Sequence, residues 1–283
     1  MKRMNMFILI AVTLLSCGQD GDSTEKVETT KLLTTKTIEI EQQIDGQMVS
    51  RSVIIQAPAV SDAATKYPLV FAFHGRGGNN NYWVNTLSQF TDSGAFIGIY
   101  PQGHLNSWNL GPEPSTADDI AFVNTIVETL LTYTNVDSEK IFAIGSSNGA
   151  GMVNTLAAKT QHFKAIAPVA SQLIASINIS LQTKPVSIFQ INGAQDDVIP
   201  IEGGERLGHS FFSAYESAQK WAVQFGCDLS PVETTIAGNA SYVFSGCSDQ
   251  AVVQYFRVEN AGHGISGAYP QLWQHIWTFF LSR

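Results

Sequence analysis

The sequence predicts one α/β domain, with a mostly parallel central sheet, helices on both faces and an N-terminal antiparallel hairpin. Short apolar runs alternate with segments of helical periodicity, which is typical of parallel sheets with crossover helices. A chain of 283 residues, 44% of them hydrophobic, also suffices to bury one large core. The apolar runs, expected to be strands buried on both faces, are residues 69–73, 96–100, 141–144, 165–169, 186–191 and 252–258.

The hairpin is predicted before the first of these runs. Residues 35–41 and 48–56 alternate apolar and polar side chains and flank the turn residues Asp45 and Gly46. Alternation on both sides of an Asp-Gly pair is a strong hairpin signal. We therefore expect two antiparallel strands at one edge of the sheet.

The helices are predicted from apolar residues at helical spacing. Residues 118–133 carry this pattern, and residues 211–225 and 270–280 are further candidates. Asp118 and Asp119 open the first of these helices, where negative charge stabilises the helix end. We expect no catalytic role for this acidic pair.

A GxSxG pentapeptide, residues 145–149, follows the apolar run 140–144, where a buried strand should end and a helix begin. Glycines on both sides allow the tight turn that exposes the hydroxyl of Ser147, which makes this serine a candidate nucleophile. The backbone N–H of Asn148 then opens the helix and can face a developing oxyanion. The alternative is a tight turn with an incidental serine.

A serine nucleophile needs a histidine base and a carboxylate that orients it. His263 is the predicted base, because it lies between glycines directly after the strand at 252–258. His275 lies within a helical segment, where packing explains it, and His209 follows too closely on the acid candidates. The predicted acid is Asp196, in the loop after the strand at 186–191, and Asp197 is the alternative. Turn formation is the structural explanation for both aspartates.

The second oxyanion donor is expected in the glycine-rich loop after the strand at 69–73, where the N–H of Arg76 is the candidate. His74 in this loop and Trp108 after the strand at 96–100 are candidates for substrate binding. A structural role for His74 and core packing for Trp108 are the alternatives. The sequence contains no phosphate-loop, HExxH or CxxC motif, so we expect no cofactor and no catalytic metal.

The N-terminus predicts export. Lys2 and Arg3 precede an apolar stretch, residues 6–15, that is too short to span a bilayer, and Leu14-Leu15-Ser16-Cys17 is typical of a bacterial lipobox. We expect a signal peptide at 1–16, a polar tether at 17–33 that begins with the lipidated Cys17, and the catalytic domain at 34–283. The protein would lie in the cell envelope or outside the cell. A plain secretory signal is the alternative.

The remaining cysteines, Cys227 and Cys247, form an even pair in an exported and oxidising setting, so we expect them to be bridged, with two buried free thiols as the alternative. The formal net charge is −8 and becomes more negative when Lys2 and Arg3 leave with the signal peptide. Nucleic acid is therefore not an expected partner. Membrane contact is expected only through the lipid, and a monomer is expected.

Several ordered motifs between residues 67 and 277 carry a family resemblance. They are His74-Gly75, Tyr100-Pro101, Trp108-Asn109, Asp118-Asp119, the GxSxG pentapeptide, residues 193–200 with Asp196, and Gly262-His263. With them the chain resembles the secreted polyhydroxybutyrate depolymerase-like and feruloyl esterase-like α/β-hydrolases.

The resemblance implies an α/β-hydrolase fold in which Ser147, Asp196 and His263 are nucleophile, acid and base. The chain departs from the family in having Gly264-Ile265-Ser266-Gly267 where Trp-Pro-Gly is common, Asn192 in place of a histidine and Ser107 in place of a cysteine. These departures weaken any transfer of substrate preference.

The expected function is that of an exported serine esterase acting on feruloyl or acetyl esters of plant polysaccharide. Cleavage of hydroxyalkanoate polyesters or oligomers is the alternative within the same chemistry. A noncatalytic surface lipoprotein that binds glycans or proteins is an alternative of another class, and a peptidase on the same fold is a third.

Overall fold

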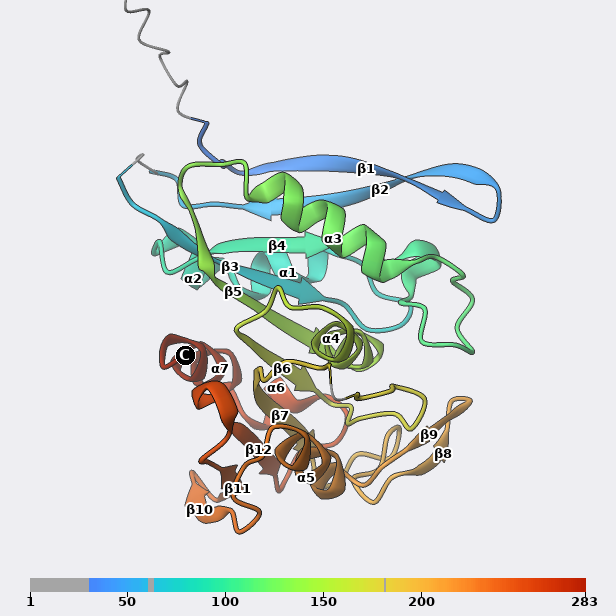
Figure 1. The fold of residues 1–283 in the computed structure, drawn as a ribbon, viewed down its shortest axis with the longest axis vertical. Coiled ribbons are helices and arrows are strands. Elements are labelled where there is room, and N and C mark those ends of the chain that lie inside the picture. The colour runs from blue at the N-terminus through green and yellow to red at the C-terminus, as the bar shows by residue number, and fades with distance from the viewer. Residues whose placement is uncertain (1–30, 61–63, 181) are drawn as a thin grey trace, which may run out of the picture.

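The computed structural model describes residues 31–60, 64–180 and 182–283. Its central feature is a ten-stranded sheet with the order β1-β2-β4-β3-β5-β6-β7-β12-β11-β10 (Figure 1). The predicted signal peptide and Cys17 lie outside the described residues. The strands of this sheet are β1 (Lys36–Ile44), β2 (Gln47–Gln56), β3 (Tyr67–Phe73), β4 (Ile97–Pro101), β5 (Val136–Ser146), β6 (Ala165–Val169), β7 (Ser187–Gly193), β10 (Val232–Ile236), β11 (Asn239–Phe244) and β12 (Val253–Val258).

The centre of the sheet is parallel and its edges are antiparallel. Strands β4, β3, β5, β6, β7 and β12 pair in parallel, whereas β1 and β2 form a hairpin at one edge and β10 and β11 add antiparallel strands at the other. All six predicted apolar strands and the predicted hairpin are confirmed. The register sets Phe73 opposite Gly145 and Gly193 opposite Val258, so the carboxyl ends of these strands meet at one rim.

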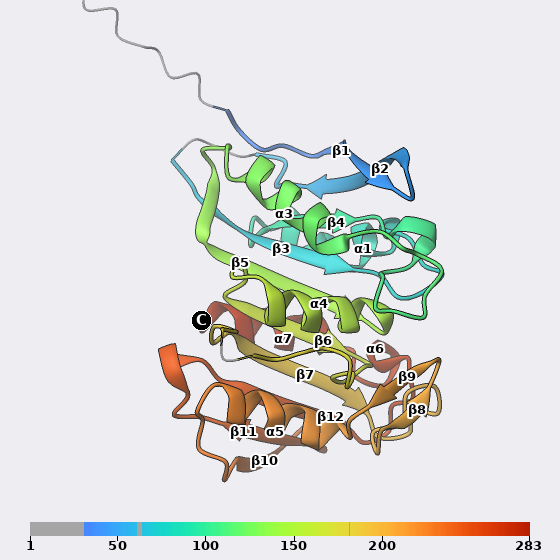
Figure 2. The ribbon, with the colours of Figure 1, turned by 45° about the vertical axis from the view of Figure 1, so that its right-hand side comes forward.

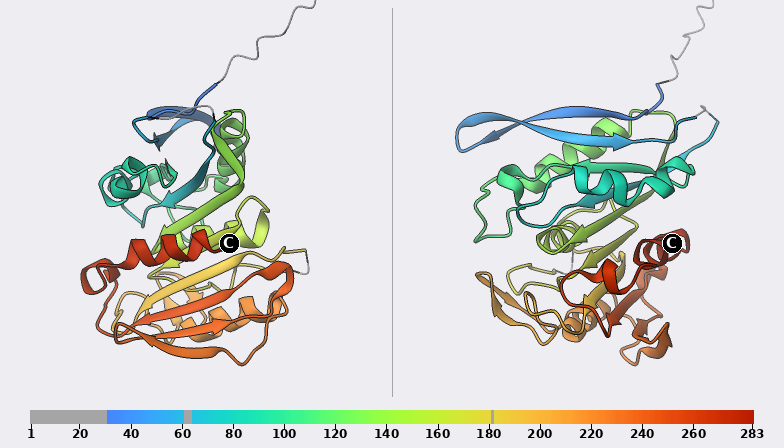
Figure 3. Two further views of the ribbon diagram at one scale, coloured as in Figure 1. Left: turned by 90° about the vertical axis from the view of Figure 1, so that its left-hand side faces the viewer. Right: turned by 180° about the vertical axis from the view of Figure 1, so that it is seen from behind.

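The helices cover both faces of the sheet. Helices α3, α4 and α5 contribute side chains to one buried cluster, and α1, α2, α6 and α7 contribute to the other. Figure 3 (left) shows α7 on one side of the sheet and α3 on the opposite side. The helices are α1 (Asn81–Thr86), α2 (Ser88–Asp92), α3 (Asp119–Leu130), α4 (Asn148–Lys159), α5 (Ala214–Gln224), α6 (Ile265–Ala268) and α7 (Leu272–Leu281). No helix in these described ranges is long and apolar enough to cross a membrane.

The described residues before β1 are bonded to the rest of the domain. Leu33 is fully buried, and its backbone exchanges hydrogen bonds of 2.8 and 3.0 Å with the side chain of Asn135. The carbonyl of Lys31 accepts a further bond of 2.9 Å from the N–H of Thr134. Residues 31–33, which the sequence assigns to the end of the tether, are therefore held against the loop that precedes β5.

The two aspartates at the start of α3 have different roles. Asp118 caps the helix, since its Oδ1 accepts a bond of 2.9 Å from the N–H of Ala121. Asp119 points inward and forms a buried ion pair of 2.7 Å with Arg51, and it accepts a second bond of 2.7 Å from the N–H of Asn109. Burial raises the pKa of Asp119 and lowers the pKa of Arg51, and the attraction between them opposes both shifts. The pair thereby fixes the loop after β4 against the N-terminal hairpin.

Cys227 and Cys247 form a disulfide, as predicted. The bridge links the end of α5 to the segment before β12 and closes a loop of 20 residues that contains β10 and β11. A loop of this length contributes about 3 kcal/mol in the loop-entropy model. Since every residue of β10 is exposed, the bridge compensates for an edge that contributes little to the core.

Candidate active site

Ser147 lies on a tight turn between β5 and α4, at the rim where the parallel strands end. Its backbone adopts φ 55° and ψ −118°, a left-handed conformation that costs a non-glycine residue free energy. Two close backbone contacts explain the flanking glycines. A Cβ on Gly149 would collide with the carbonyl of Phe73, and a Cβ on Gly145 would collide with the backbone of Gly149. The predicted strand, turn and helix are therefore present, with Ser147 at the apex.

His263 lies beside this serine. Its Nε2 is 2.9 Å from the Oγ of Ser147, a hydrogen-bond distance. The histidine comes from the loop after β12, whose parallel pairing with β7 brings that loop to the same rim. Its side chain is 27% exposed, so the imidazole is open to solvent on one side while it contacts the serine on the other.

Asp196 holds the other side of the imidazole. Its Oδ2 lies 2.7 Å from Nδ1 of His263, and its Oδ1 accepts bonds of 2.9 Å from the N–H groups of Val198 and Ile199. The carboxylate is fully buried, whereas Asp197 is exposed. A carboxylate at Nδ1 places the imidazole proton on that nitrogen and leaves the Nε2 lone pair for the serine proton. Of the two candidate acids, the structure brings Asp196 to the histidine.

The candidate oxyanion donors lie around the same serine. Asn148 is the first residue of α4, where backbone N–H groups lack an intrahelical acceptor. Arg76 lies in a loop that is fixed by the bond from Gly78 N–H to the Gly75 carbonyl, 3.0 Å, and by the bond from Gly77 N–H to the Asn106 carbonyl, 2.7 Å. Both Arg76 and Asn148 line the pocket that opens at Ser147. Backbone N–H groups at such positions can stabilise the negative oxygen that develops when a carbonyl carbon is attacked.

Trp108 does not reach the pocket. Its side chain is fully buried and packs against Phe73, with ring centroids 5.0 Å apart. Its indole Nε1 donates a bond of 2.8 Å to the carbonyl of His74, and its backbone N–H and carbonyl are bonded to the side-chain amide of Asn148 at 2.8 and 3.1 Å. The structure places Trp108 in the core, which is the alternative that the sequence left open, and not among the residues that line the pocket. The residue links the loop of Arg76 to the first residue of α4.

His74 is likewise buried rather than exposed to substrate. Its Nε2 accepts a bond of 3.0 Å from the N–H of Gly103, so Nδ1 carries the proton that is donated to the Gly75 carbonyl at 2.8 Å. Burial lowers the pKa of His74, which keeps the ring neutral. His74 is not among the residues that line the pocket, and its contacts fix the loop that carries Arg76.

The pocket beside Ser147 has a mostly apolar wall and one buried polar pair that the sequence interpretation missed. The carboxylate of Glu113 lies 2.7 Å from Nε2 of His209, and both side chains are almost fully buried. These residues are 96 positions apart, and no local motif links them. The apolar wall consists of Leu110, Ile174, Ile199, Leu207 and Phe211.

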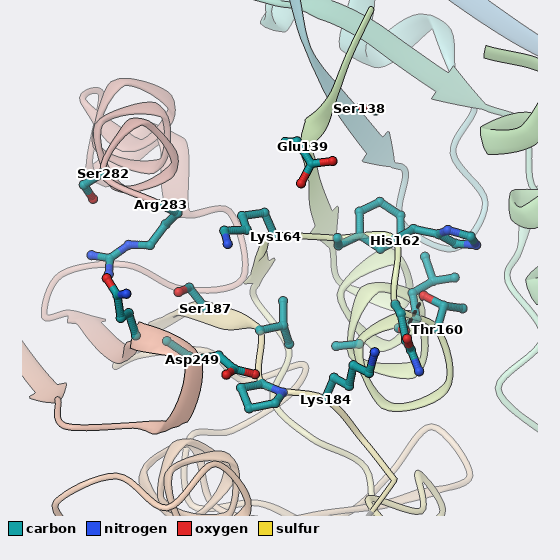
Figure 4. Close-up of a pocket in the computed structure, with 18 residues that line it drawn as sticks. Ser138, Glu139, Thr160, His162, Lys164, Lys184, Ser187, Asp249, Ser282 and Arg283 are labelled. Atoms are coloured by element: carbon teal, nitrogen blue, oxygen red, sulfur yellow. Dashed lines mark hydrogen bonds between the residues drawn. The ribbon is translucent and has the colours of Figure 1, made fainter. Parts of the chain in front are cut away.

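A larger cavity lies at the opposite end of the sheet. It has a volume of about 540 Å³, and Figure 4 shows Lys164, Ser187 and Arg283 among the side chains that line it. Lys164 directly precedes β6 and Ser187 begins β7, and the other ends of these strands approach Ser147. Because Ser147, His263 and Asp196 are absent from its lining, this cavity is not part of the candidate site. The part of the chain that the structure describes has no cluster of three or more His, Cys, Asp or Glu residues that could hold a metal.

Curated relatives of the chain are esterases. It is 30% identical over 210 residues to a probable feruloyl esterase C of Aspergillus clavatus, a match that covers 70% of this chain and 71% of that protein. It is 29% identical over 214 residues to feruloyl esterase C of Emericella nidulans, covering 72% and 73% of the two chains. A match to feruloyl esterase B of Piromyces equi, 27% identical over 228 residues, spans 75% of this chain and 42% of that longer protein. No family model matches the chain.

Solved structures share the fold. The acetyl xylan esterase from Aspergillus awamori superposes with a TM-score of 0.59 at 16% identity, covering 84% of this chain and 98% of that one. A thermophilic esterase of Thermogutta terrifontis gives a TM-score of 0.58 at 13% identity, covering 88% and 92%. Identities this low support a common architecture, and the chemistry has to be argued from the side chains around Ser147.

Proposed function

Because this chain belongs to the feruloyl esterase family of α/β-hydrolases and is a serine hydrolase of carboxylic ester bonds, we propose that Ser147, His263 and Asp196 are its catalytic triad. The observation that carries the proposal is the continuous chain of hydrogen bonds from the Ser147 hydroxyl through the imidazole to the buried carboxylate, at 2.9 and 2.7 Å. The strained backbone at Ser147 costs free energy, and a catalytic role of this serine accounts for the strain.

In the first half of the reaction His263 accepts the hydroxyl proton at Nε2 while the Oγ of Ser147 bonds to the ester carbonyl carbon. The carbonyl oxygen becomes an oxyanion that accepts hydrogen bonds from the backbone N–H groups of Asn148 and Arg76. When the intermediate collapses, the bond to the alkoxy oxygen breaks and His263 returns its proton to the leaving alcohol. Asp196 stabilises the imidazolium while it exists.

In the second half, water replaces the alcohol. His263 takes a proton from the water as its oxygen attacks the acyl carbon, and the same two backbone N–H groups stabilise the second oxyanion. The bond from the acyl carbon to Oγ then breaks, the imidazolium returns the proton to Ser147, and the carboxylic acid leaves. Each oxyanion donor of this kind accounts for about 10²- to 10³-fold in kcat.

The proposed substrates are feruloyl or acetyl esters of plant polysaccharide. The relatives named as feruloyl esterases and the fold of the acetyl xylan esterase support this class. The five apolar side chains in the pocket beside Ser147 support binding of an acyl group.

A substrate panel tests the proposal. Purified protein should hydrolyse acetylated xylan or methyl ferulate, and it should act much more slowly on hydroxybutyrate oligomers and on the amide analogue of whichever ester is cleaved. Release of acetate or ferulate is measured by chromatography against the Ser147→Ala protein as the blank. Preferential cleavage of the hydroxybutyrate oligomers or of the amide would overturn the substrate assignment.

We also propose that the enzyme acts outside the cytoplasm. The disulfide between Cys227 and Cys247 supports an oxidising compartment. Lipidation at Cys17 stays a prediction from the sequence, and the mass of the mature N-terminal peptide, with or without a lipid on Cys17, tests it.

A further inference from the structure

A short hairpin stands over the pocket beside Ser147. It consists of β8 (Gly204–Arg206) and β9 (His209–Phe211), which form a separate two-stranded sheet (Figure 2). Its base is tied to the segment after β6, because Ala175 N–H donates to the Ser210 carbonyl at 2.8 Å and Phe212 N–H donates to the Leu173 carbonyl at 3.2 Å. Phe211 near this base and Leu207 in the turn both line the pocket.

A polar contact near the outer end of the hairpin holds it to the loop after β4, and we name this contact the latch. The latch is the 2.7 Å bond between Nε2 of His209 and Oε1 of Glu113, a residue of the loop after β4. The Glu113 carboxylate accepts two further hydrogen bonds. Its Oε2 accepts from Leu110 N–H at 3.0 Å, and its Oε1 also accepts from Nδ2 of Asn148 at 3.3 Å. The latch therefore connects the hairpin to the first residue of the nucleophile helix.

The latch is poorly explained as a source of stability. A buried ionisable pair must be desolvated, and replacing such pairs with apolar residues is often neutral or stabilising. The side chains of Glu113 and His209 are only 3% and 6% exposed, in a pocket that is also lined by five apolar side chains. A pair of this kind is better explained by the position that it fixes.

Leu207 at the hairpin turn breaks two local preferences. Its φ is 54°, which is unfavourable for a residue with a Cβ, and its side chain is 52% exposed although it is large and apolar. Gly208 follows at φ 83° and packs against Pro112, where an added Cβ would lie 3.0 Å from the proline Cβ. Strain and exposure at the mouth of a pocket point to contact with a ligand.

The pocket is small when the hairpin is in this position. The space that it encloses is about 30 Å³, and the pocket is otherwise open to solvent. The methyl of an acetyl group fits such a space beside Ser147. A hydroxycinnamoyl ring is larger than this enclosed space, so it would extend toward solvent or displace the hairpin.

We propose that Glu113 and His209 are specificity-determining residues that hold the hairpin as the wall of the acyl pocket and so limit the enzyme to small acyl groups, acetyl above all. This inference rests on the proposed function, because it assumes that acyl esters react at Ser147. It adds which side chains set the acyl size and which of the two proposed ester classes the enzyme favours.

The test compares acyl lengths on one leaving group. With p-nitrophenyl acetate, butyrate and octanoate, kcat/KM of the unaltered enzyme should fall as the acyl chain lengthens. His209→Ala should raise the ratio of kcat/KM for octanoate to that for acetate at least tenfold, because the wall is no longer held. His209→Gln keeps a side-chain donor for Glu113 and should restore much of the original ratio.

Two further variants make the result decisive. Arg206→Ala changes an exposed residue on the same hairpin, opposite His209 in the strand pairing and outside the pocket lining, and should leave the ratio unchanged. Leu207→Ala shortens the wall at an exposed position and should raise the ratio even if His209→Ala fails to fold. An octanoate-to-acetate ratio that stays unchanged in folded His209→Ala would overturn the inference. If His209→Ala does not fold, an unchanged ratio in Leu207→Ala would overturn it.

Failure of the inference is distinguishable from failure of the proposed function. If the unaltered enzyme cleaves none of the p-nitrophenyl esters, the esterase assignment itself is wrong. If it cleaves them but prefers octanoate, or if His209→Ala lowers all rates by one common factor, the triad stands and the latch is only structural.

Discussion

Ser147→Ala should lower kcat for ester hydrolysis by about 10⁵- to 10⁶-fold, the loss seen when a triad nucleophile is removed. The hydroxyl has one side-chain partner among the described residues, Nε2 of His263, so its removal leaves the bond between His263 and Asp196 in place. The variant should therefore fold like the parent. Rates on p-nitrophenyl acetate, with circular dichroism and the thermal midpoint as fold controls, measure the effect. A folded variant that keeps more than a hundredth of the parent rate contradicts the assignment.

Asp196→Asn should lower kcat by about 10⁴-fold, the size of effect that the same change has in other triads. The amide oxygen can still accept the bonds from the N–H groups of Val198 and Ile199, so the loop keeps its shape. The amide nitrogen then faces Nδ1 of His263 and donates to it, which moves the imidazole proton to Nε2. In that tautomer the histidine cannot accept the serine proton.

Asp197→Asn is the matched control for this variant. The neighbouring carboxylate is exposed, and it makes no hydrogen bond to His263 in the described structure. The Asp197→Asn protein should retain the parent kcat within about twofold. Equal losses in the two variants, or a larger loss for Asp197→Asn, would show that the orienting carboxylate is assigned to the wrong residue.

The fold was largely predictable because its signals are local. The apolar runs of the central strands and the Asp45-Gly46 turn lie within a few residues of one another, and all of these elements are confirmed. β10 and β11 were missed because β10 is wholly exposed and therefore carries no apolar pattern. The contacts of Leu33 could not be predicted, because its partner Asn135 lies 102 positions away.

The candidate site was predictable where a residue type and a turn coincide. Ser147 and His263 follow strands and are flanked by glycines, and the structure brings them within hydrogen-bond distance. The sequence left open whether Trp108 and His74 contact substrate or pack in the core, because exposure of a side chain depends on tertiary packing, and the structure buries both. Glu113 and His209 were missed for the same reason, since their contact joins two loops with no shared motif.

The central claim is that the hydroxyl of Ser147 is activated by His263. The most direct measurement is labelling of folded protein with a fluorophosphonate, followed by mass spectrometry of the peptides. The account predicts one adduct, on Ser147, formed at least a hundred times more slowly in His263→Ala. No adduct on the folded enzyme, an adduct on another serine, or labelling of Ser147 at the same rate without the histidine would contradict it.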